Sequence, residues 1–550
     1  MKKLTFLFVL ALFIISCKEE TATKFFITYD ETAELAENEK HQSKRMQYKL
    51  IQSKYLDMND VFAPFKNELS KFTEEEYNEL KPLIIERDIP TLQAHIGNGD
   101  LTYEKLTLFY LYRIRKFESD STKSLNSIIA LNPNVLKEAR KKDKEKGGKS
   151  EYSIYGMPIL LKDNINTNNM PTTAGAIALA NNKKTQDAFI VNKLKENGAL
   201  ILGKVNLSEW AYFFCSGCPL GYSAVGGQTL NPYGRRVFET GGSSAGSGVT
   251  VAANFAVAAV GTETSGSITS PSSLNSVVGL KPTIGVLSRT GIVPISSTLD
   301  TPGPMTKNVI DNAIFLEAMF GNDIKDKASI AKDLRKKDFQ IELFVDNSLK
   351  GKRFGVMKRF LSDSIYKLSI EKIKNAGGII VELNPKQANF NGFLTLLNID
   401  MKNDLPKYLA NNADKKISVT TVKDVTLFNA KDSVLRFPYG QQLFNGIVND
   451  STTLEQLEVV KNNLNNEGKK YLQGLYDENL DAILSINNSL SGVSAVAKYP
   501  TLTVPMGYRK TGEPRSLTFT GKPFSERTLL KLGYAFEQLT KVRKIPENYQ

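Results

Sequence analysis

The sequence predicts an α/β fold, in which a β-sheet has helical cover, and three observations support this. Short apolar segments typical of buried strands alternate with longer segments of helical periodicity between residues 155 and 320. The same alternation restarts at Arg353. Hydrophobic residues make up 41% of the 550 residues, which is enough to bury a large core.

The N-terminal part is predicted to be helical. Over residues 72–143 apolar side chains recur at helical spacing, with Leu106, Leu108, Leu111 and Ile114 in one such run. We therefore expect an N-terminal helical region over residues 46–150, followed by an α/β domain over residues 151–545.

Within the α/β domain, strands are predicted at the short apolar segments. These are residues 155–161, 199–202, 257–260, 277–281, 353–357, 379–383, 481–486, 502–505 and 516–520. Helices are predicted at residues 188–197, 249–255, 308–320, 361–376 and 525–542, the last with Ser525 as its N-cap. Residues 385–475 are polar, irregular and mostly helical, and we expect a peripheral elaboration there.

The net charge of +13 does not indicate a nucleic-acid partner. The densest basic run, residues 137–149, also contains Glu138, Asp143 and Glu145, which is typical of a solvated helix face. No basic stretch carries interleaved aromatic residues that could stack on bases. We expect neither a nucleic-acid partner nor a cofactor.

The first 17 residues resemble a bacterial lipoprotein signal. Lys2 and Lys3 precede an apolar segment, residues 4–15, which is too short to cross a bilayer as a stable helix. It ends in Ser16-Cys17, a small residue before cysteine, as at the lipidation site of bacterial lipoproteins. An ordinary secretory signal with a chance cysteine is the alternative.

A lipoprotein signal has consequences for the mature chain. Residues 1–17 would be a signal peptide, and Cys17 would carry the lipid that attaches the protein to a membrane. Residues 18–45 are polar and without periodicity, so we expect a tether there. The expected location is the outer membrane, with the folded part in the periplasm or at the cell surface.

The other two cysteines, Cys215 and Cys218, form a C-x-x-C pair. A zinc site would need a second such pair or a pair of histidines, and the sequence has neither, so no metal site is expected. In an exported protein the pair is expected to be a structural disulfide or two unreactive thiols.

Two segments rich in glycine and serine, residues 241–247 and 261–268, indicate a functional site. Glycine and serine in such density cannot form a core. They let the backbone approach a ligand and present N–H groups and hydroxyls at one place. A predicted helix and strand separate the two segments, which favours one site built from both.

The histidines exclude a Ser-His-Asp triad. Residues 242–246 match the G-x-S-x-G motif, which would make Ser244 a nucleophile with a histidine later in the chain. The two histidines, His41 and His95, both precede it. The base that activates a serine must then be of another type, and lysine is the usual one.

Lys162 is the candidate base, because it follows the apolar residues 157–161 at the end of a predicted buried strand. Lysine has an ordinary pKa of about 10.4 and is charged at neutral pH, whereas a base must be neutral. Burial lowers the pKa of lysine. From spacing alone, a side chain that reaches solvent from the strand end remains the alternative.

Three motifs, in order and in register, resemble those of the amidase signature family. They are GMPILLKDN at residues 156–164, GGSSAGS at 241–247, and GTETSGSI at 261–268 followed by GLKPT at 279–283. Residues 208–211, 226–229, 263–268, 294–296 and 525–530 are similar to peptide amidases within that family. The resemblance implies a mixed, twisted central sheet covered by helices on both faces, with an N-terminal helical region and a helical insertion.

The resemblance also implies a catalytic triad. Ser267 is similar to the nucleophile that forms the acyl-enzyme, Ser243 to a bridging serine that follows a cis peptide bond, and Lys162 to the base. Lys162 would take a proton from Ser243, which takes one from Ser267, and the proton would return to the leaving nitrogen. The oxyanion hole would be formed by the backbone N–H groups of Thr264, Ser265, Gly266 and Ser267.

Two positions depart from the family pattern. Ser265 stands where the family often has glycine, or aspartate in the nearest relatives, and Thr269 replaces the usual arginine. Neither change affects the triad, but both bear on substrate preference.

The predicted function is hydrolysis of carboxylic amide bonds, with C-terminal amides of peptides as a candidate substrate class. The partner would be a small-molecule or peptide amide, and the product ammonia or an amine. A glutaminase-type subunit of a tRNA-dependent amidotransferase shares the motifs, but its task is cytoplasmic, and the expected export signal opposes this hypothesis. A catalytically inactive, ligand-binding lipoprotein is a third hypothesis, which the intact Lys162, Ser243 and Ser267 oppose.

Overall fold

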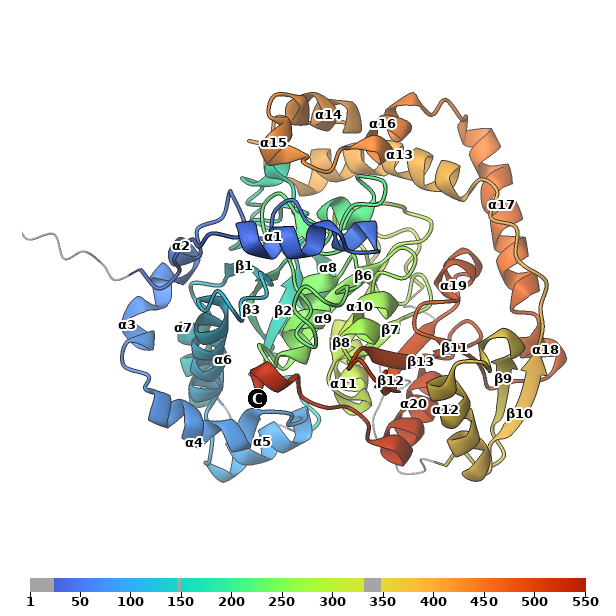
Figure 1. Ribbon diagram of the computed structural model, residues 1–550, viewed down its shortest axis with the longest axis horizontal. Helices are drawn as coiled ribbons and strands as arrows, with labels where there is room; N and C mark the ends of the chain where they lie inside the picture. The colour runs from blue at the N-terminus through green and yellow to red at the C-terminus, as the bar shows by residue number, and fades with distance from the viewer. Residues whose placement is uncertain (1–23, 146–149, 331–347) are drawn as a thin grey trace, which may run out of the picture.

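The computed structural model describes residues 24–145, 150–330 and 348–550, and its centre is a large β-sheet (Figure 1). The strands of this sheet are β1 (Ile128–Leu131), β2 (Pro158–Lys162), β3 (Leu200–Val205), β6 (Ala258–Glu263), β7 (Val278–Lys281), β8 (Thr301–Thr306), β9 (Arg353–Met357), β10 (Ile379–Leu383), β11 (Ala482–Ile486), β12 (Thr501–Tyr508) and β13 (Pro514–Thr520). Their order is β1-β3-β2-β6-β8-β7-β12-β13-β11-β9-β10. A separate short pair joins β4 (Tyr222–Ser223) to β5 (Gly227–Gln228).

The sheet is mixed. Strand β2 runs parallel to both β3 and β6, and β9 runs parallel to β10 and β11, while the other neighbours pair antiparallel. The predicted α/β fold with a mixed central sheet and helical cover is confirmed.

The N-terminal region is helical, as predicted, and lies on the left in Figure 1 except for its first helix, which crosses the upper middle of the molecule. Its helices are α1 (Thr32–Glu39), α2 (Met58–Phe62), α3 (Lys66–Leu69), α4 (Glu74–Ile84), α5 (Ile89–Asn98), α6 (Tyr103–Glu118) and α7 (Val135–Lys144). Sequence periodicity missed β1, which forms the sheet edge next to β3. A four-residue apolar run carries no periodicity that separates a strand from a helix.

A tether was expected over residues 18–45. Residues 24–45, which are the part of this segment that the structure describes, do not form one. These residues include α1, which packs on the folded body. Asn38 is buried, and its Nδ2 donates to the backbone oxygens of Met46 and Arg236, each at 3.0 Å. The polar side chains of this helix include ones that bind the folded body, as Glu34 does by pairing with Arg235 and Arg236. Its composition alone therefore resembles that of a tether. The expected signal peptide and Cys17 lie outside the described residues.

The helices packed around the sheet are α8 (Phe189–Glu196), α9 (Ala245–Ala252), α10 (Thr269–Leu274), α11 (Val309–Met319), α12 (Ser364–Asn375), α19 (Ser491–Ala497) and α20 (Glu526–Thr540). Ser525 precedes α20 as predicted, but its side chain makes no capping bond to the helix. Strand β8 was not predicted, because Pro302 and Pro304 argue against a central strand. It nevertheless lies between β6 and β7.

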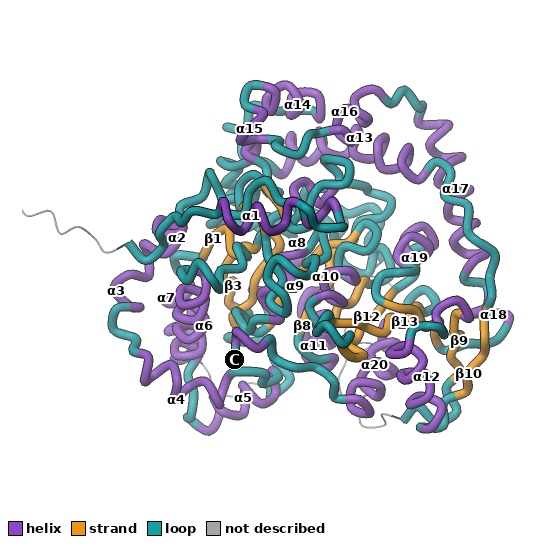
Figure 2. The backbone as a smooth tube through the Cα atoms, viewed as in Figure 1, coloured by secondary structure: helices purple, strands orange, loops and turns teal. Residues whose placement is uncertain are grey.

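Residues 385–475 form a helical insertion, which crosses the top of Figure 1 and descends on its right. Its helices are α13 (Phe393–Asn412), α14 (Val422–Ala430), α15 (Ser433–Arg436), α16 (Gln442–Asn449), α17 (Leu454–Tyr471) and α18 (Gly474–Asp477). Figure 2 shows that it contributes no strand to the sheet. A second apolar core, called the insertion core, joins the insertion to the main domain and buries Leu405, Phe444 and Leu464 together with Trp210 of the main domain. No helix of the described residues combines the length and the apolar character needed to cross a bilayer.

Candidate active site

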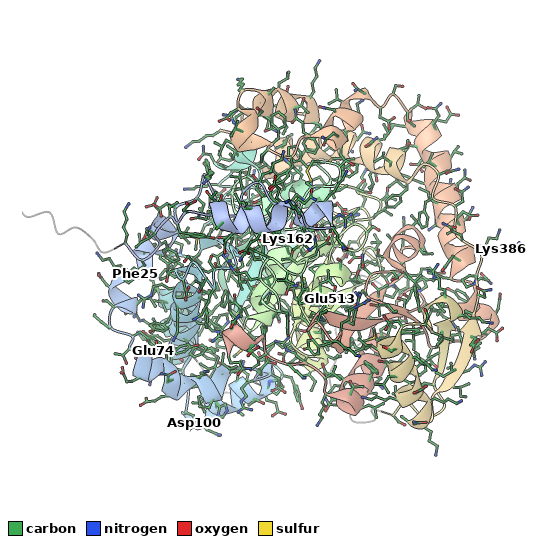
Figure 3. The ribbon with its side chains drawn as sticks, in the orientation of Figure 1. Phe25, Glu74, Asp100, Lys162, Lys386 and Glu513 are labelled. Carbon is green, nitrogen blue, oxygen red and sulfur yellow. A yellow bond between two sulfur atoms is a disulfide. The ribbon has the colours of Figure 1, made fainter. Side chains whose placement is uncertain are left out.

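Strand β2 carries Lys162 into the interior. All five residues of the strand are buried between β3 and β6, and Lys162 is 0% exposed. Figure 3 places it near the middle of the molecule, away from Asp100 and Lys386 at its margins. The alternative that Lys162 reaches solvent is therefore wrong.

The amine of Lys162 contacts three oxygen atoms. Its Nζ lies 2.7 Å from Ser243 Oγ, 2.8 Å from Thr262 Oγ1 and 3.2 Å from the carbonyl oxygen of Thr262. A neutral amine has two N–H groups and one lone pair. The carbonyl oxygen and the hydroxyl of Thr262 can each accept one of the N–H groups. The lone pair is then available to the hydroxyl proton of Ser243, as a base requires.

Burial sets the protonation state of this amine. It lowers the pKa of Lys162 from 10.5 to about 7, and the negative charges of Asp300 and Glu263 oppose the shift only in part. A large fraction of Lys162 is thus neutral near pH 7. This is the main electrostatic feature of the site.

Ser243 stands between Lys162 and the second glycine-serine segment. The Gly242–Ser243 peptide bond is cis, as the resemblance implied, and Ser243 is 0% exposed. Its backbone oxygen accepts a hydrogen bond from the N–H of Ser208. Ser244 is also buried, and its hydroxyl donates to the Thr262 carbonyl, so the G-x-S-x-G nucleophile is excluded by structure as well as by the lack of a later histidine.

Ser267 lies on the loop between β6 and α10 and is 8% exposed. Its backbone oxygen accepts from the N–H of Ser244 at 3.2 Å, which ties the two glycine-serine segments together. The hydrogen bonds among the described residues do not include one between the hydroxyls of Ser243 and Ser267. The structure thus joins Lys162 to Ser243 directly and brings Ser267 to the same place through the backbone.

Glu263, at the end of β6, holds residues 264–267, which we call the oxyanion loop because the oxyanion hole is expected there. Its carboxylate accepts from the N–H groups of Gly266 at 2.7 Å, Ile268 at 2.7 Å and Thr269 at 2.9 Å. The Gly266 N–H, expected in the oxyanion hole, is therefore engaged with Glu263. Three of the four expected donors remain, on Thr264, Ser265 and Ser267.

The same loop explains the departure at Ser265. The left-handed conformation falls on Gly266, with φ of 89°, and Ser265 is not among the residues with positive φ. A side chain at position 265 therefore adds no backbone strain. The serine is compatible with the loop.

Sequence reasoning missed the polar partners that surround the triad. Thr262 accepts from Lys162 and also from Asn164 Nδ2 at 3.0 Å. Asp300 accepts from the hydroxyl of Thr264 at 2.5 Å. Asn164 and Thr262 lie within recognised motifs, but nothing in the sequence around Asp300 marks it.

A second missed feature is a buried ion pair beside the site. Asp163 and Lys204 are both 0% exposed, with 3.1 Å between Lys204 Nζ and Asp163 Oδ1. Asp163 also accepts from Thr173. Burial raises the pKa of Asp163 and lowers that of Lys204, and their mutual attraction opposes both shifts. The pair joins β3 to the residue that follows Lys162.

Replacing Lys204 with methionine is expected to lower the free energy of unfolding by about 3–5 kcal/mol, because it leaves a buried carboxylate without its cation. Urea unfolding would measure this. Adding Asp163→Asn should recover part of the loss, since the uncompensated charge is then gone. Losses that simply add in the double variant would contradict the pairing.

The cysteines of the C-x-x-C pair are joined as a disulfide between Cys215 and Cys218. Both side chains are buried against the insertion core. The structure thus selects the disulfide from the two alternatives that the sequence left open.

Comparisons with known proteins agree on one family. The family model named Amidase matches residues 105–487. A probable amidase of Arabidopsis thaliana is 34% identical over 481 residues, which is 84% of this chain and 92% of that protein. The crystal structure of an amidase family protein from Bacillus anthracis has a TM-score of 0.84 at 38% identity, covering 90% of this chain and 100% of that one. The native peptide amidase from Stenotrophomonas maltophilia has a TM-score of 0.78 at 35% identity, covering 84% of this chain and 99% of that one.

Proposed function

Because this chain belongs to the amidase family and is a hydrolase of amide C–N bonds, we propose that it cleaves carboxylic amides through an acyl-enzyme on Ser267. The base is Lys162, and Ser243 relays the proton between them. C-terminal amides of peptides are the proposed substrate class.

The proposed reaction has two halves. In the first, Lys162 takes a proton from Ser243, Ser243 takes one from Ser267, and Ser267 Oγ attacks the amide carbonyl. The resulting oxyanion receives hydrogen bonds from the N–H groups of Thr264, Ser265 and Ser267. Collapse breaks the C–N bond, and the proton returns through Ser243 to the leaving nitrogen. In the second half, water attacks the acyl-enzyme along the same proton path and releases the acid.

One observation carries the proposal. The Lys162 amine is shielded from water, lies 2.7 Å from Ser243 Oγ and has a pKa lowered to about 7. General bases work best when their pKa lies near the working pH. A lysine that served only as a structural cation would have no reason to contact the hydroxyl of Ser243 in preference to a carboxylate.

The peptide substrate class is supported by likeness in the residues around the site. Residues 208–211 resemble those of peptide amidases, and the first of them, Ser208, donates its N–H to the backbone oxygen of Ser243. The Stenotrophomonas maltophilia protein, which is a peptide amidase by name, matches 84% of this chain.

The test is ammonia release by the chain lacking residues 1–17, offered amidated peptides, fatty amides, aryl amides and free glutamine. We expect the fastest release from amidated peptides. Release from glutamine alone would favour the glutaminase hypothesis. A fluorophosphonate probe should label the wild type and not Ser267→Ala, and absence of label on the wild type would favour the ligand-binding hypothesis.

A further inference from the structure

A tight turn, residues 295–300, touches the oxyanion loop. We call it the connecting turn. Asp300, its last residue, accepts from the Thr264 hydroxyl through Oδ1 at 2.5 Å. Through Oδ2 it accepts from the N–H groups of Ile295 at 2.8 Å and Ser296 at 2.9 Å, which closes the turn on itself. Asp300 therefore holds the connecting turn and the oxyanion loop together.

The other side of the connecting turn is held by helix α13 of the insertion. Asp400 and Asp404 lie four residues apart, so both project from one face of the helix. Asp400 Oδ2 accepts from Ser296 Oγ at 2.5 Å and from the N–H of Thr298 at 3.2 Å. Asp404 Oδ2 accepts from the N–H of Ser297 at 2.8 Å. Two carboxylates of the insertion thus fix three consecutive residues of the turn.

Of the two carboxylates, Asp400 is more buried than Asp404. It is 3% exposed, and the serine it binds, Ser296, is 0% exposed. Its other oxygen lies 3.3 Å from Lys461 Nζ on α17, which supplies the compensating charge. A continuous chain of contacts therefore runs from α17 through Asp400, Ser296 and Asp300 to Thr264 in the oxyanion loop.

We propose that Asp400 is a positioning residue for amide hydrolysis, which acts through the connecting turn on the oxyanion loop. The inference rests on the proposed function. Oxyanion stabilisation depends on donors that are already in place before charge develops. Displacement of such groups by about 1 Å can cost on the order of 10²-fold in rate. The insertion is peripheral to the sheet, yet this contact makes it part of the catalytic apparatus.

Stability alone does not test the inference. Removing the Asp400 carboxylate leaves the buried Ser296 hydroxyl without its acceptor and removes one of the two carboxylates that pair with Lys461, the other being Glu458, so some loss of stability is expected in any case. A positioning role has a kinetic signature as well. It lowers kcat while KM stays nearly constant, because the transition state needs the oxyanion donors more than the bound substrate does.

The experiment compares Asp400→Ala, Ser296→Ala and the double variant, using a short N-acetylated, C-terminally amidated peptide. We expect each single variant to lower kcat by about 10–100-fold with KM within about 3-fold. The double variant should be no worse than the poorer single, because both changes break one chain of contacts. The rate of labelling by a fluorophosphonate probe should fall in parallel with kcat, and this readout does not depend on the substrate chosen.

Two further variants sharpen the comparison. Asp450→Ala is the matched control for Asp400→Ala, since Asp450 also accepts a bond from α13, at Asn398, but does not contact the connecting turn. It should leave kcat within about 2-fold of wild type. Asp400→Asn keeps a side-chain oxygen that can accept from Ser296, so it should retain more activity than Asp400→Ala.

The inference is overturned if Asp400→Ala lowers the melting temperature but leaves kcat unchanged, or if it raises KM alone. It is also overturned if the effects of Asp400→Ala and Ser296→Ala add, or if Asp400→Asn loses as much activity as Asp400→Ala. Failure of the proposed function looks different, because Ser267→Ala would then still react with the fluorophosphonate probe and still release ammonia.

Discussion

Replacing Ser267 with alanine is expected to lower kcat by about 10⁶-fold, the order of loss that follows removal of a serine nucleophile. Without the hydroxyl no acyl-enzyme forms, and water must attack the amide directly. Steady-state ammonia release from an amidated peptide would measure the loss. The melting temperature should change little, because the side chain of Ser267 makes no hydrogen bond among those of the described residues.

The control for this loss is Ser273→Ala. Ser273 lies on α10, the helix that follows Ser267, and its hydroxyl donates to the backbone oxygen of Thr269 within the helix. Its removal perturbs the same element without touching the proposed proton path, so activity should stay within a few-fold of wild type. Comparable losses in both variants would point to disturbance of α10 instead of nucleophilic catalysis by Ser267.

The fold could be predicted from the sequence where local pattern determines structure. Residues 353–357 and 379–383, each an apolar run after a turn, coincide with β9 and β10. Strand β8 could not be predicted, because its two prolines are tolerated only through its particular pairing with β6 and β7. Helix α1 was missed because its own residues give no sign of burial. Its polar residues are satisfied by arginines some 200 positions later, and no local pattern records such a contact.

The residues of the site also divide into those that a local motif marks and those that only the folded structure reveals. Lys162, Ser243 and Ser267 stand in compact motifs that resemble those of the amidase signature family, and this resemblance is what implies their roles. Asp300 and Asp400 act across 36 and 104 residues of sequence, and each is an ordinary aspartate in its own segment. The engagement of the Gly266 N–H by Glu263 was equally invisible, because it depends on how the loop folds back on the strand end.

The acid limb of the pH profile is expected to fall with an apparent pKa of about 7, because only neutral Lys162 can accept a proton. Two pH units lower, about 1% of the base remains neutral. Burial also raises the pKa of Asp300 to about 6, so a further loss is expected below pH 6, when this carboxylate is protonated and can no longer accept from all its partners. Measurement of kcat/KM between pH 5 and 9 tests both steps.

The same shift predicts how stability depends on pH. The folded protein holds the pKa of Lys162 at about 7, against 10.5 for an ordinary lysine. Between these values the unfolded chain binds more protons, so the free energy of unfolding falls as the pH is lowered from about 10 to 7. For the wild type this contribution is about 3–4 kcal/mol.

Lys162→Met, which lacks the titrating amine, isolates that contribution. It should be inactive, and its stability relative to wild type should improve by about 3–4 kcal/mol between pH 10 and pH 7. Urea unfolding of both proteins at the two pH values measures the difference. Because the hydrogen bonds lost in the variant are the same at both pH values, they cancel in this comparison and leave the cost of keeping an amine neutral inside the protein. A difference that does not change with pH would mean that Lys162 stays charged in the folded state, and a charged amine could not accept the proton of Ser243.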